Sequence, residues 1–391
     1  MVCTRPDRYN LAAPSDTDMN RPLLFALTLS LASASCAEYV MAPGADAARP
    51  VDGSDASADV FRPIPVNVTC TMAYGTTICE GRYVPTVLNP AVQEVRTGTG
   101  GTGEPARHYF CYPVGVAHND KLLLYLVGTT DSPTQYIEFP RRACALGYAA
   151  VSIAYHNEVD SRSTCMANSG CYEAFRREIV YGMDALPDPI RVNQTNSILG
   201  RFLGVLTVLE EREVYFPPWR AIHTRVAARD FTKVAVAGHS QGSGHALFIA
   251  RDFEVERLIM LAGVTDRMNS GLGTHAAPGW IAGWNPASAQ TPSTRFFTYM
   301  HDDDGVAVVR QVLSNWDLLR VPAMECPWSA MGPYAPACHR VRHPAARCGG
   351  GEAHNMVMVG AFGSATNDCL LSGTMNRNDA TFRHLLTAPT E

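Results

Sequence analysis

Five short, almost continuous apolar runs dominate the hydrophobic pattern, and polar or glycine-containing segments separate them. The runs cover 121–127, 149–155, 234–237, 255–262 and 295–300. Continuous rather than alternating apolar residues are typical of strands that are buried on both faces of a sheet. A helix predicted over 134–146 ends at Gly147, which suits a helix C-cap, and joins the first two runs. Such a strand–helix–strand unit predicts a parallel sheet with right-handed crossovers.

The segments between the runs are expected to hold helices and irregular loops. Residues 156–230 form a long excursion with a helix near 172–183. A longer helix follows, and its apolar face comprises Ile198, Phe202, Val205 and Leu209. The remaining expectations are irregular structure over 263–294, a helix over 306–319, a short strand at 338–342 and a glycine loop at 349–351.

Residues 98–103 match the Gly-x-Gly-x-x-Gly pattern of a dinucleotide-binding loop. That loop follows a buried strand and opens a helix, whereas here no apolar strand immediately precedes the glycines and Glu104-Pro105 follows them. We therefore expect a hairpin loop that leads into the apolar segment 108–112.

The run at 234–237 leads into Gly238-His239-Ser240-Gln241-Gly242, which is followed by helix-compatible residues. Strand, sharp turn and helix is the context of a nucleophile elbow, in which strained backbone angles expose a serine hydroxyl above the sheet. Side chains at the two glycine positions would collide with the neighbouring strand or helix. The helix N-terminus beneath Ser240 favours negative charge. The alternative interpretation is a glycine-rich turn without a catalytic role.

The N-terminal region has the three parts of a secretory signal peptide. Arg21 precedes the apolar run 23–31, and small residues then lead to Cys36. The run is too short to span a membrane. We predict Met19 as the true start. Cys36 is a candidate lipidation site, and cleavage after Ala34 is the alternative.

The chain is accordingly predicted to comprise a signal peptide over 1–36, a flexible linker over 37–60 and a catalytic domain over 61–391. Its 391 residues are 46% hydrophobic, which is enough for one large core or two modest ones. The net charge of −5, without any basic run, argues against a nucleic-acid partner.

Apart from Cys3 and Cys36, ten of the twelve cysteines belong to the predicted catalytic domain. They are Cys70, Cys79, Cys111, Cys144, Cys165, Cys171, Cys326, Cys338, Cys348 and Cys369. An even set behind an export signal predicts disulfides, with Cys70–Cys79 and Cys165–Cys171 as local pairs. The alternative is a metal site around Cys338, His339, His343 and Cys348, although no Cys-x-x-Cys pair accompanies it.

A serine nucleophile needs a base to take its proton, and the base needs an acid to orient it. The run at 295–300 is followed by three aspartates, 302–304, which are the candidate acids. The alternative role for Asp304 is to cap the helix over 306–319. The candidate bases are His339, His343, His354 and His384. His239 and His245 lie too close to the serine along the chain, and we expect them to pack or to form hydrogen bonds.

Over roughly 105–385 the chain resembles the α/β-hydrolase superfamily. The order Ser240, Asp304, His354 matches that family's Ser…Asp…His order. The elbow is similar to those of secreted lipases and esterases. Residues 301–306 resemble the family's loop after strand seven, which favours Asp304 over Asp302 and Asp303. Residues 350–354 resemble the loop that presents the base, with His343 as the main rival.

The resemblance implies an α/β-hydrolase fold, with a mostly parallel central sheet and helices on both faces, and here disulfide-containing insertions. It also implies an oxyanion hole formed by the backbone N–H groups of Gln241 and Thr129. The family often has His-Gly before the second donor, whereas this chain has Val127-Gly128.

The expected activity is hydrolysis of carboxylic esters, of small molecules or lipids, through an acyl-enzyme intermediate on Ser240. No metal or organic cofactor is expected. We expect a secreted, periplasmic or surface-tethered protein. The segments 156–230 and 263–294 are expected to shape the pockets, with Trp280 and Trp284 lining one or pinning a loop to the core. The alternatives are a peptidase or acyltransferase with the same three residues, or a non-catalytic surface-binding module with this fold.

Overall fold

The computed structural model describes residues 67–88, 92–96, 103–183, 186, 190–212, 215–269, 275–329, 332–344, 350–358 and 378–390. The predicted signal peptide and linker lie outside these ranges, as do Cys36 and the first residues of the predicted catalytic domain. Those boundaries therefore remain predictions. Within the described ranges, no helix is both long and apolar enough to cross a membrane.

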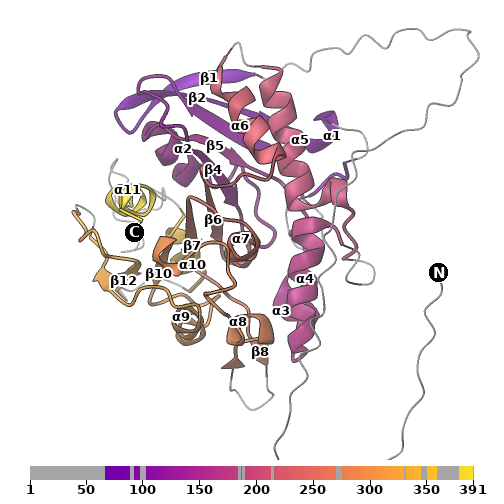
Figure 1. The fold of residues 1–391 in the computed structure, drawn as a ribbon, viewed down its shortest axis with the longest axis vertical. Coiled ribbons are helices and arrows are strands. Elements are labelled where there is room, and N and C mark those ends of the chain that lie inside the picture. The colour runs from indigo at the N-terminus through magenta and orange to yellow at the C-terminus, as the bar shows by residue number, and fades with distance from the viewer. Residues whose placement is uncertain are drawn as a thin grey trace, which may run out of the picture. The chain divides into compact units, whose positions relative to one another are not determined.

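A ten-stranded sheet lies at the centre of the described part of the chain (Figure 1). From edge to edge its strands are β1 (Val68–Ala73), β2 (Thr76–Tyr83), β3 (His108–Pro113), β5 (Ala149–Ser152), β4 (Leu122–Leu126), β6 (Val234–His239), β7 (Arg257–Leu261), β10 (Phe296–His301), β12 (Arg340–His343) and β11 (Glu325–Pro327). From β5 to β11 all neighbours are parallel, whereas β1, β2 and β3 pair antiparallel. The mostly parallel sheet confirms the predicted fold class.

The five apolar runs became β4, β5, β6, β7 and β10, and every residue of these strands is buried. In the sheet, β4 lies between β5 and β6. The chain therefore adds β5 on one side of β4 and then crosses over to add β6 on the other side. The loops after β4 and β6 therefore meet at the carboxyl edge, at the switch point where open α/β sheets bind ligands.

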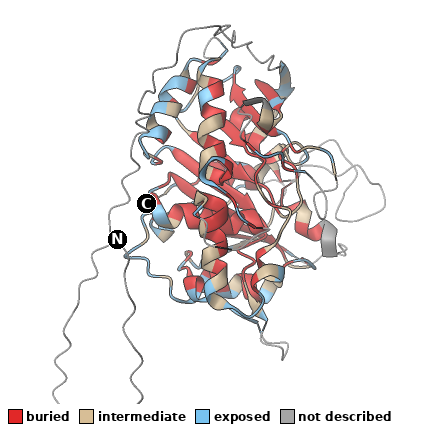
Figure 2. Ribbon diagram, turned by 90° about the vertical axis from the view of Figure 1, so that its right-hand side faces the viewer, coloured by how far each residue is buried: buried red, intermediate tan, exposed pale blue. Residues whose placement is uncertain are grey.

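Helices enclose the sheet, and Figure 2 shows buried strands beneath helices with exposed outer surfaces. They are α1 (Pro85–Leu88), α2 (Glu138–Ala145), α3 (Ser161–Cys165), α4 (Ser169–Tyr181), α5 (Ile198–Glu210), α6 (Pro218–Ala227), α7 (Gln241–Asp252), α8 (Gly279–Ala282), α9 (Val309–Leu318), α10 (Gly350–Met356) and α11 (Asp379–Thr387), with 3-10 turns η2 (Gln194–Asn196) and η3 (Ser293–Arg295). In Figure 1, α2 and α11 lie on one side of the sheet, and α4 to α7 lie on the other. The rings of Phe139 and Phe382 join α2 to α11, with centroids 5.0 Å apart.

Some element boundaries differ from the predicted ones for local reasons. α2 begins four residues late because the Ser132 N–H donates to the Gln135 side chain and the Gln135 N–H donates to the Ser132 carbonyl, which makes a turn. Gly147 then follows the helix with φ +91°, as its C-cap role predicts. The segment 263–294 is not wholly irregular, since it holds α8, η3 and the hairpin of β8 (Met268–Asn269) with β9 (His275–Ala276).

The glycine segment at 98–103 lies almost entirely outside the described residues, but its flanks are defined. Arg96 forms an antiparallel bridge with Pro105, and the Ala106 N–H donates to the Val95 carbonyl at 2.7 Å. The chain therefore returns on itself across this segment and continues into β3, which agrees with the predicted hairpin.

Four disulfides lie within the described ranges: Cys70–Cys79, Cys111–Cys144, Cys165–Cys171 and Cys326–Cys338. The two predicted local pairs are confirmed. Cys165–Cys171 joins α3 to α4 within the long excursion. Cys348 and Cys369 lie outside the described residues. Because Cys338 is bonded to Cys326, its sulfur is not a free thiolate ligand for the alternative metal site.

Candidate active site

Ser240 occupies the turn between β6 and α7. Its φ of +52° and ψ of −120° are strained for a residue with a side chain. A Cβ added at Gly238 would meet the backbone of Gly242, and one added at Gly242 would meet the carbonyl oxygens of Leu126 and Val127. The turn can form only because both positions lack side chains. This is the geometry of a nucleophile elbow.

Asp304 and His354 come together at the carboxyl edge of the sheet although 50 residues separate them. Asp304 follows β10, and His354 lies in α10. The Nδ1 atom of His354 lies 2.7 Å from Oδ2 of Asp304, with both side chains almost fully buried. The other carboxylate oxygen, Oδ1, accepts hydrogen bonds from the N–H groups of Val306 at 2.9 Å and Ala307 at 2.8 Å. Asp304 thus stabilises the turn that follows it. It does not cap α9, because that helix begins only at Val309.

His354 also contacts the residue that precedes the elbow serine. Nε2 of His239 donates to the backbone carbonyl of His354 at 3.0 Å, and the two imidazole rings lie 4.6 Å apart. Since His239 and Ser240 are neighbours in the chain, this contact brings the helix that carries His354 to the elbow.

The surroundings of His354 favour its neutral form. Burial lowers the pKa of His354 below its usual range, and the adjacent His239 lowers it further, while the hydrogen bond to Asp304 opposes these effects. A neutral imidazole whose Nδ1 donates to a carboxylate leaves Nε2 as an acceptor, which is the form that a general base requires.

Four of the rival residues have other partners, and these four are Asp302, His343, His339 and His384. Asp302 pairs with Arg342 at 2.8 Å. The His343 ring stacks on His301 and lies tilted against Trp328, and burial lowers its pKa to about 4. His339 donates a hydrogen bond to the Phe296 carbonyl, and His384 donates one to the Cys338 carbonyl. His354, by contrast, is hydrogen-bonded to the carboxylate of Asp304. As expected, His239 forms a hydrogen bond, and His245 packs between Tyr155 and Phe175.

The expected glycine loop around the base was wrong, because residues 350–356 form α10. Glycine costs about 1 kcal/mol relative to alanine within a helix, which made a loop the natural prediction. Ala353 and Met356 are buried, and His354 bonds Asp304. These contacts offset the low helix propensity of the segment. Gly349 lies outside the described residues.

The loop after β4 lies directly against Ser240. A Cβ added at Gly128 would lie 3.2 Å from the Ser240 Cβ and 3.0 Å from Nδ1 of His239, so only glycine fits without a shift. The Asn157 side chain donates to the carbonyls of Gly128 and Asp131, at 2.5 and 2.9 Å, and the Thr130 N–H donates to the Asn157 carbonyl at 3.0 Å. The sequence analysis missed Asn157, which anchors this loop next to Thr129.

The Gln241 N–H opens α7 directly after Ser240. Helix-opening N–H groups lack an acceptor within their own helix. The structure thus brings Ser240, Asp304, His354, Gln241 and the loop of Thr129 to one edge of the sheet. Trp280 is buried, and its Nε1–H donates to Asp266 at 3.1 Å, so this tryptophan pins its loop to the core. The Trp284 ring packs edge-on against Phe296.

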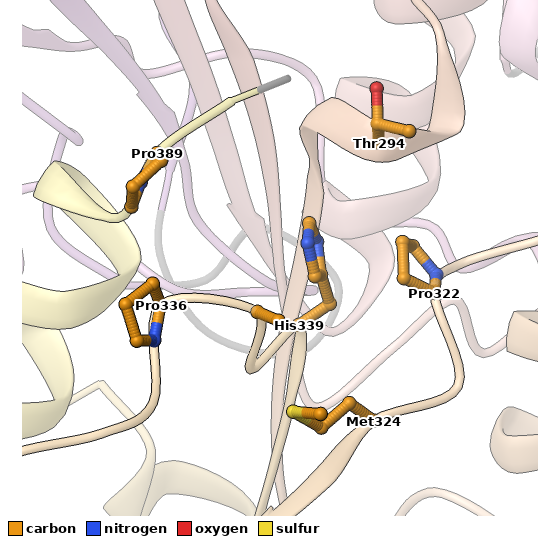
Figure 3. Close-up of a pocket in the computed structure, with 7 residues that line it drawn as sticks. Thr294, Pro322, Met324, Pro336, His339 and Pro389 are labelled. Atoms are coloured by element: carbon orange, nitrogen blue, oxygen red, sulfur yellow. The ribbon is translucent and has the colours of Figure 1, made fainter.

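A cavity of about 360 Å³ lies at the opposite, amino edge of the sheet (Figure 3). Pro389 follows α11, and the other lining residues lie shortly before the first residues of β10, β11 and β12. These are Thr294, Pro322, Met324, Pro336, Ala337 and His339. Of the candidate bases, His339 lines this cavity, whereas Ser240, Asp304 and His354 do not.

Strand order, the elbow and the cluster at the carboxyl edge together define an α/β-hydrolase fold. Along the chain the three candidate residues come in the order serine, aspartate, histidine. No protein-family model and no curated protein matches the chain. Solved structures with similar folds include a dienelactone hydrolase described as putative from Klebsiella pneumoniae (10% identity, TM-score 0.33, 66% of this chain and 85% of that one). A cold-adapted esterase from an Arctic intertidal metagenomic library has 13% identity and TM-score 0.35, over 72% and 89% of the two chains. An S-formylglutathione hydrolase from Agrobacterium tumefaciens has 13% identity and TM-score 0.34, over 71% and 90%. Such distant likeness carries no argument about activity.

Proposed function

We propose that the protein is a serine hydrolase that cleaves carboxylic esters. Ser240 is the nucleophile, His354 the general base and Asp304 the acid that orients the base. The backbone N–H groups of Gln241 and Thr129 form the oxyanion hole. The observation that carries the proposal is the buried hydrogen bond between His354 and Asp304, beside the strained elbow of Ser240.

The reaction follows from the roles of these groups. Nε2 of His354 takes the Ser240 proton as Oγ attacks the acyl carbon, while Asp304 holds the proton on Nδ1. The N–H groups at the elbow and in the loop after β4 stabilise the negative oxygen of the tetrahedral intermediate. The C–O bond to the alcohol breaks, and the imidazolium protonates the leaving alcohol. Water, deprotonated by His354, then releases the acid from Ser240.

The substrate we propose is a small-molecule or lipid ester, and the protein is proposed to act outside the cytoplasm. The four disulfides support an oxidising compartment. Export through the segment 1–36, with a lipid tether at Cys36 or cleavage after Ala34, is part of this proposal.

The test compares the parent protein with Ser240→Ala on chromogenic esters of short and long acyl chains. Labelling by a fluorophosphonate probe is measured in parallel. We expect the parent to hydrolyse esters and to be labelled, and the variant to lose both properties. Ser152→Ala is the matched control, since it removes the hydroxyl of another buried serine, in β5, which bonds no residue of the elbow. Ester hydrolysis at the parental rate in Ser240→Ala would end the assignment. A faster reaction with amides, or with an alcohol acceptor in place of water, would redirect it to a peptidase or an acyltransferase.

A further inference from the structure

A buried polar cluster beneath the elbow is not explained by the proposed chemistry alone. It comprises Arg176 of α4, Asp266 of the loop after β7, Ser161 of α3 and Gln241 of α7, and we call it the elbow clamp. Arg176 and Asp266 have no exposed side-chain surface, and Ser161 and Gln241 are at most 2% exposed. These four residues come from four separate parts of the chain.

The ion pair is held by several directional bonds. The Arg176 guanidinium donates to both carboxylate oxygens of Asp266. Asp266 also accepts the Ser161 hydroxyl at 2.9 Å and the Trp280 indole N–H at 3.1 Å. Its carboxylate is therefore saturated with donors, which is the condition under which a charge can be buried without a large penalty.

Within the elbow clamp, Gln241 forms hydrogen bonds through both its backbone and its side chain. Nη1 of Arg176 donates to the Gln241 carbonyl at 3.0 Å. The Gln241 side chain accepts from the Ser161 N–H and donates to the Val159 carbonyl, each at 3.0 Å. A Cβ added at Gly244 would overlap the guanidinium, so α7 is thinned where Arg176 passes beneath it.

We propose that the elbow clamp is a positioning device for the oxyanion hole, an inference that rests on the proposed function. The bonds from Arg176 and Ser161, together with the one to the Val159 carbonyl, fix three polar groups of Gln241. They thereby set the direction of the Gln241 N–H, which is the donor expected to bind the oxyanion. Arg176, Asp266, Ser161 and the Gln241 side chain are then positioning residues, and none of them touches the substrate.

Stability alone is a poor explanation for this cluster. Well-packed apolar residues in place of a buried ion pair are often equally stabilising or more so. A hydrogen-bonded ion pair also fixes the orientation of the groups around it, because each of its hydrogen bonds requires a particular geometry. Oxyanion stabilisation depends on direction, since a donor must point at the place where charge develops in the transition state.

The experiment uses two variants that leave the backbone N–H of Gln241 intact. Gln241→Met removes both side-chain hydrogen bonds with little change in volume. Arg176→Lys keeps a positive charge against Asp266 but lacks the fork that also reaches the Gln241 carbonyl. Arg340→Lys is the matched control, because Arg340 is a buried arginine that bonds Asp317 and the Val321 carbonyl, away from the elbow.

The readouts are kcat per Ser240 titrated with the fluorophosphonate, KM, and the dissociation constant of an alkylboronic acid. The boronic acid bonds the serine and places an oxygen in the oxyanion hole. Loss of one oxyanion donor costs about 10²–10³-fold in kcat, so a misdirected donor should cost about tenfold. We expect this fall in both variants with KM nearly unchanged, weaker boronic acid binding in parallel, and parental kcat per site in Arg340→Lys.

Counting only titratable sites removes any unfolded fraction from the comparison. If Arg176→Lys fails to fold, Gln241→Met decides. If kcat per site in Gln241→Met stays within about threefold of the parental value, the positioning role is overturned. Such a fall is far smaller than the one caused by losing an oxyanion donor. A parent protein that hydrolyses no ester would instead refute the proposed function, so the two failures are distinguishable.

Discussion

The two oxygens of Asp304 make different contacts, and this allows a substitution that separates catalysis from folding. Oδ2 faces Nδ1 of His354, whereas Oδ1 accepts the N–H groups of Val306 and Ala307. In Asp304→Asn, the amide oxygen can keep the two backbone N–H groups. The amide NH₂ then faces His354 and offers a donor where the imidazole N–H had donated.

That reversal forces the proton of neutral His354 onto Nε2, so the imidazole can no longer accept the Ser240 proton. An equivalent change in a serine protease lowers kcat about 10⁴-fold, which corresponds to about 5.5 kcal/mol at 1.36 kcal/mol per factor of ten. We therefore expect kcat/KM to fall about 10³–10⁴-fold in Asp304→Asn. The loss of folding stability should be about 1 kcal/mol, because a neutral acceptor replaces a charged one in two retained hydrogen bonds.

The assay measures kcat/KM on a chromogenic ester and stability by urea unfolding. Asp302→Asn and Asp303→Asn are matched controls that make the same change at neighbouring positions, and both should keep parental kcat/KM. Asp304→Ala also removes Oδ1 and leaves two N–H groups without this acceptor. It should lose about 2 kcal/mol or more of stability in addition to activity. If Asp304→Asn kept more than a tenth of the parental kcat/KM, the assignment of Asp304 as the orienting acid would be refuted.

Two further predictions concern pH and cysteine chemistry. Burial lowers the pKa of His354 and the base must be neutral, so kcat/KM should hold as pH falls to 6.5 and decline only below it. A pH–rate profile whose acidic midpoint lies above 6.5 would contradict a lowered pKa of His354. The exported protein, denatured without reductant, should show no reactive thiol from the eight cysteines that form the four disulfides of the described ranges. Cys3, Cys36, Cys348 and Cys369 lie outside these pairs, so more than four titratable thiols in a free-thiol assay would contradict the disulfide assignment.

Elements with a strong apolar pattern could be predicted from the sequence, and those without one could not. All five continuous apolar runs are strands, although β5 stops at Ser152 and the apolar residues after it remain buried outside the sheet. β1 was missed because all of its residues are exposed or half-buried, and they form no continuous apolar run. Its position depends instead on antiparallel pairing with β2 and on the disulfide Cys70–Cys79. Such pairing leaves little trace in a single segment.

The candidate site divides in the same way. The elbow is local, because a strand, two glycines and a helix start occur within a dozen residues. The choice among Asp302, Asp303 and Asp304 is not local, and it rested on family resemblance. In the structure the orienting acid is the aspartate whose carboxylate reaches His354 of α10, which is Asp304. Asp302 instead forms an ion pair with Arg342 of β12. Neither contact could be read from three consecutive aspartates.

The elbow clamp shows why the supporting residues of a site are harder to predict than its reacting ones. Arg176 and Asp266 are 90 residues apart, and each lies in a segment with no catalytic motif. A charged residue in a single sequence is expected to be solvent-exposed, because burial of an unpaired charge is costly. Only the folded arrangement supplies the partner that makes burial tolerable. A buried ion pair such as Arg176–Asp266 is therefore found only in the structure. The positioning role proposed for it is tested through the rate per active site rather than through stability.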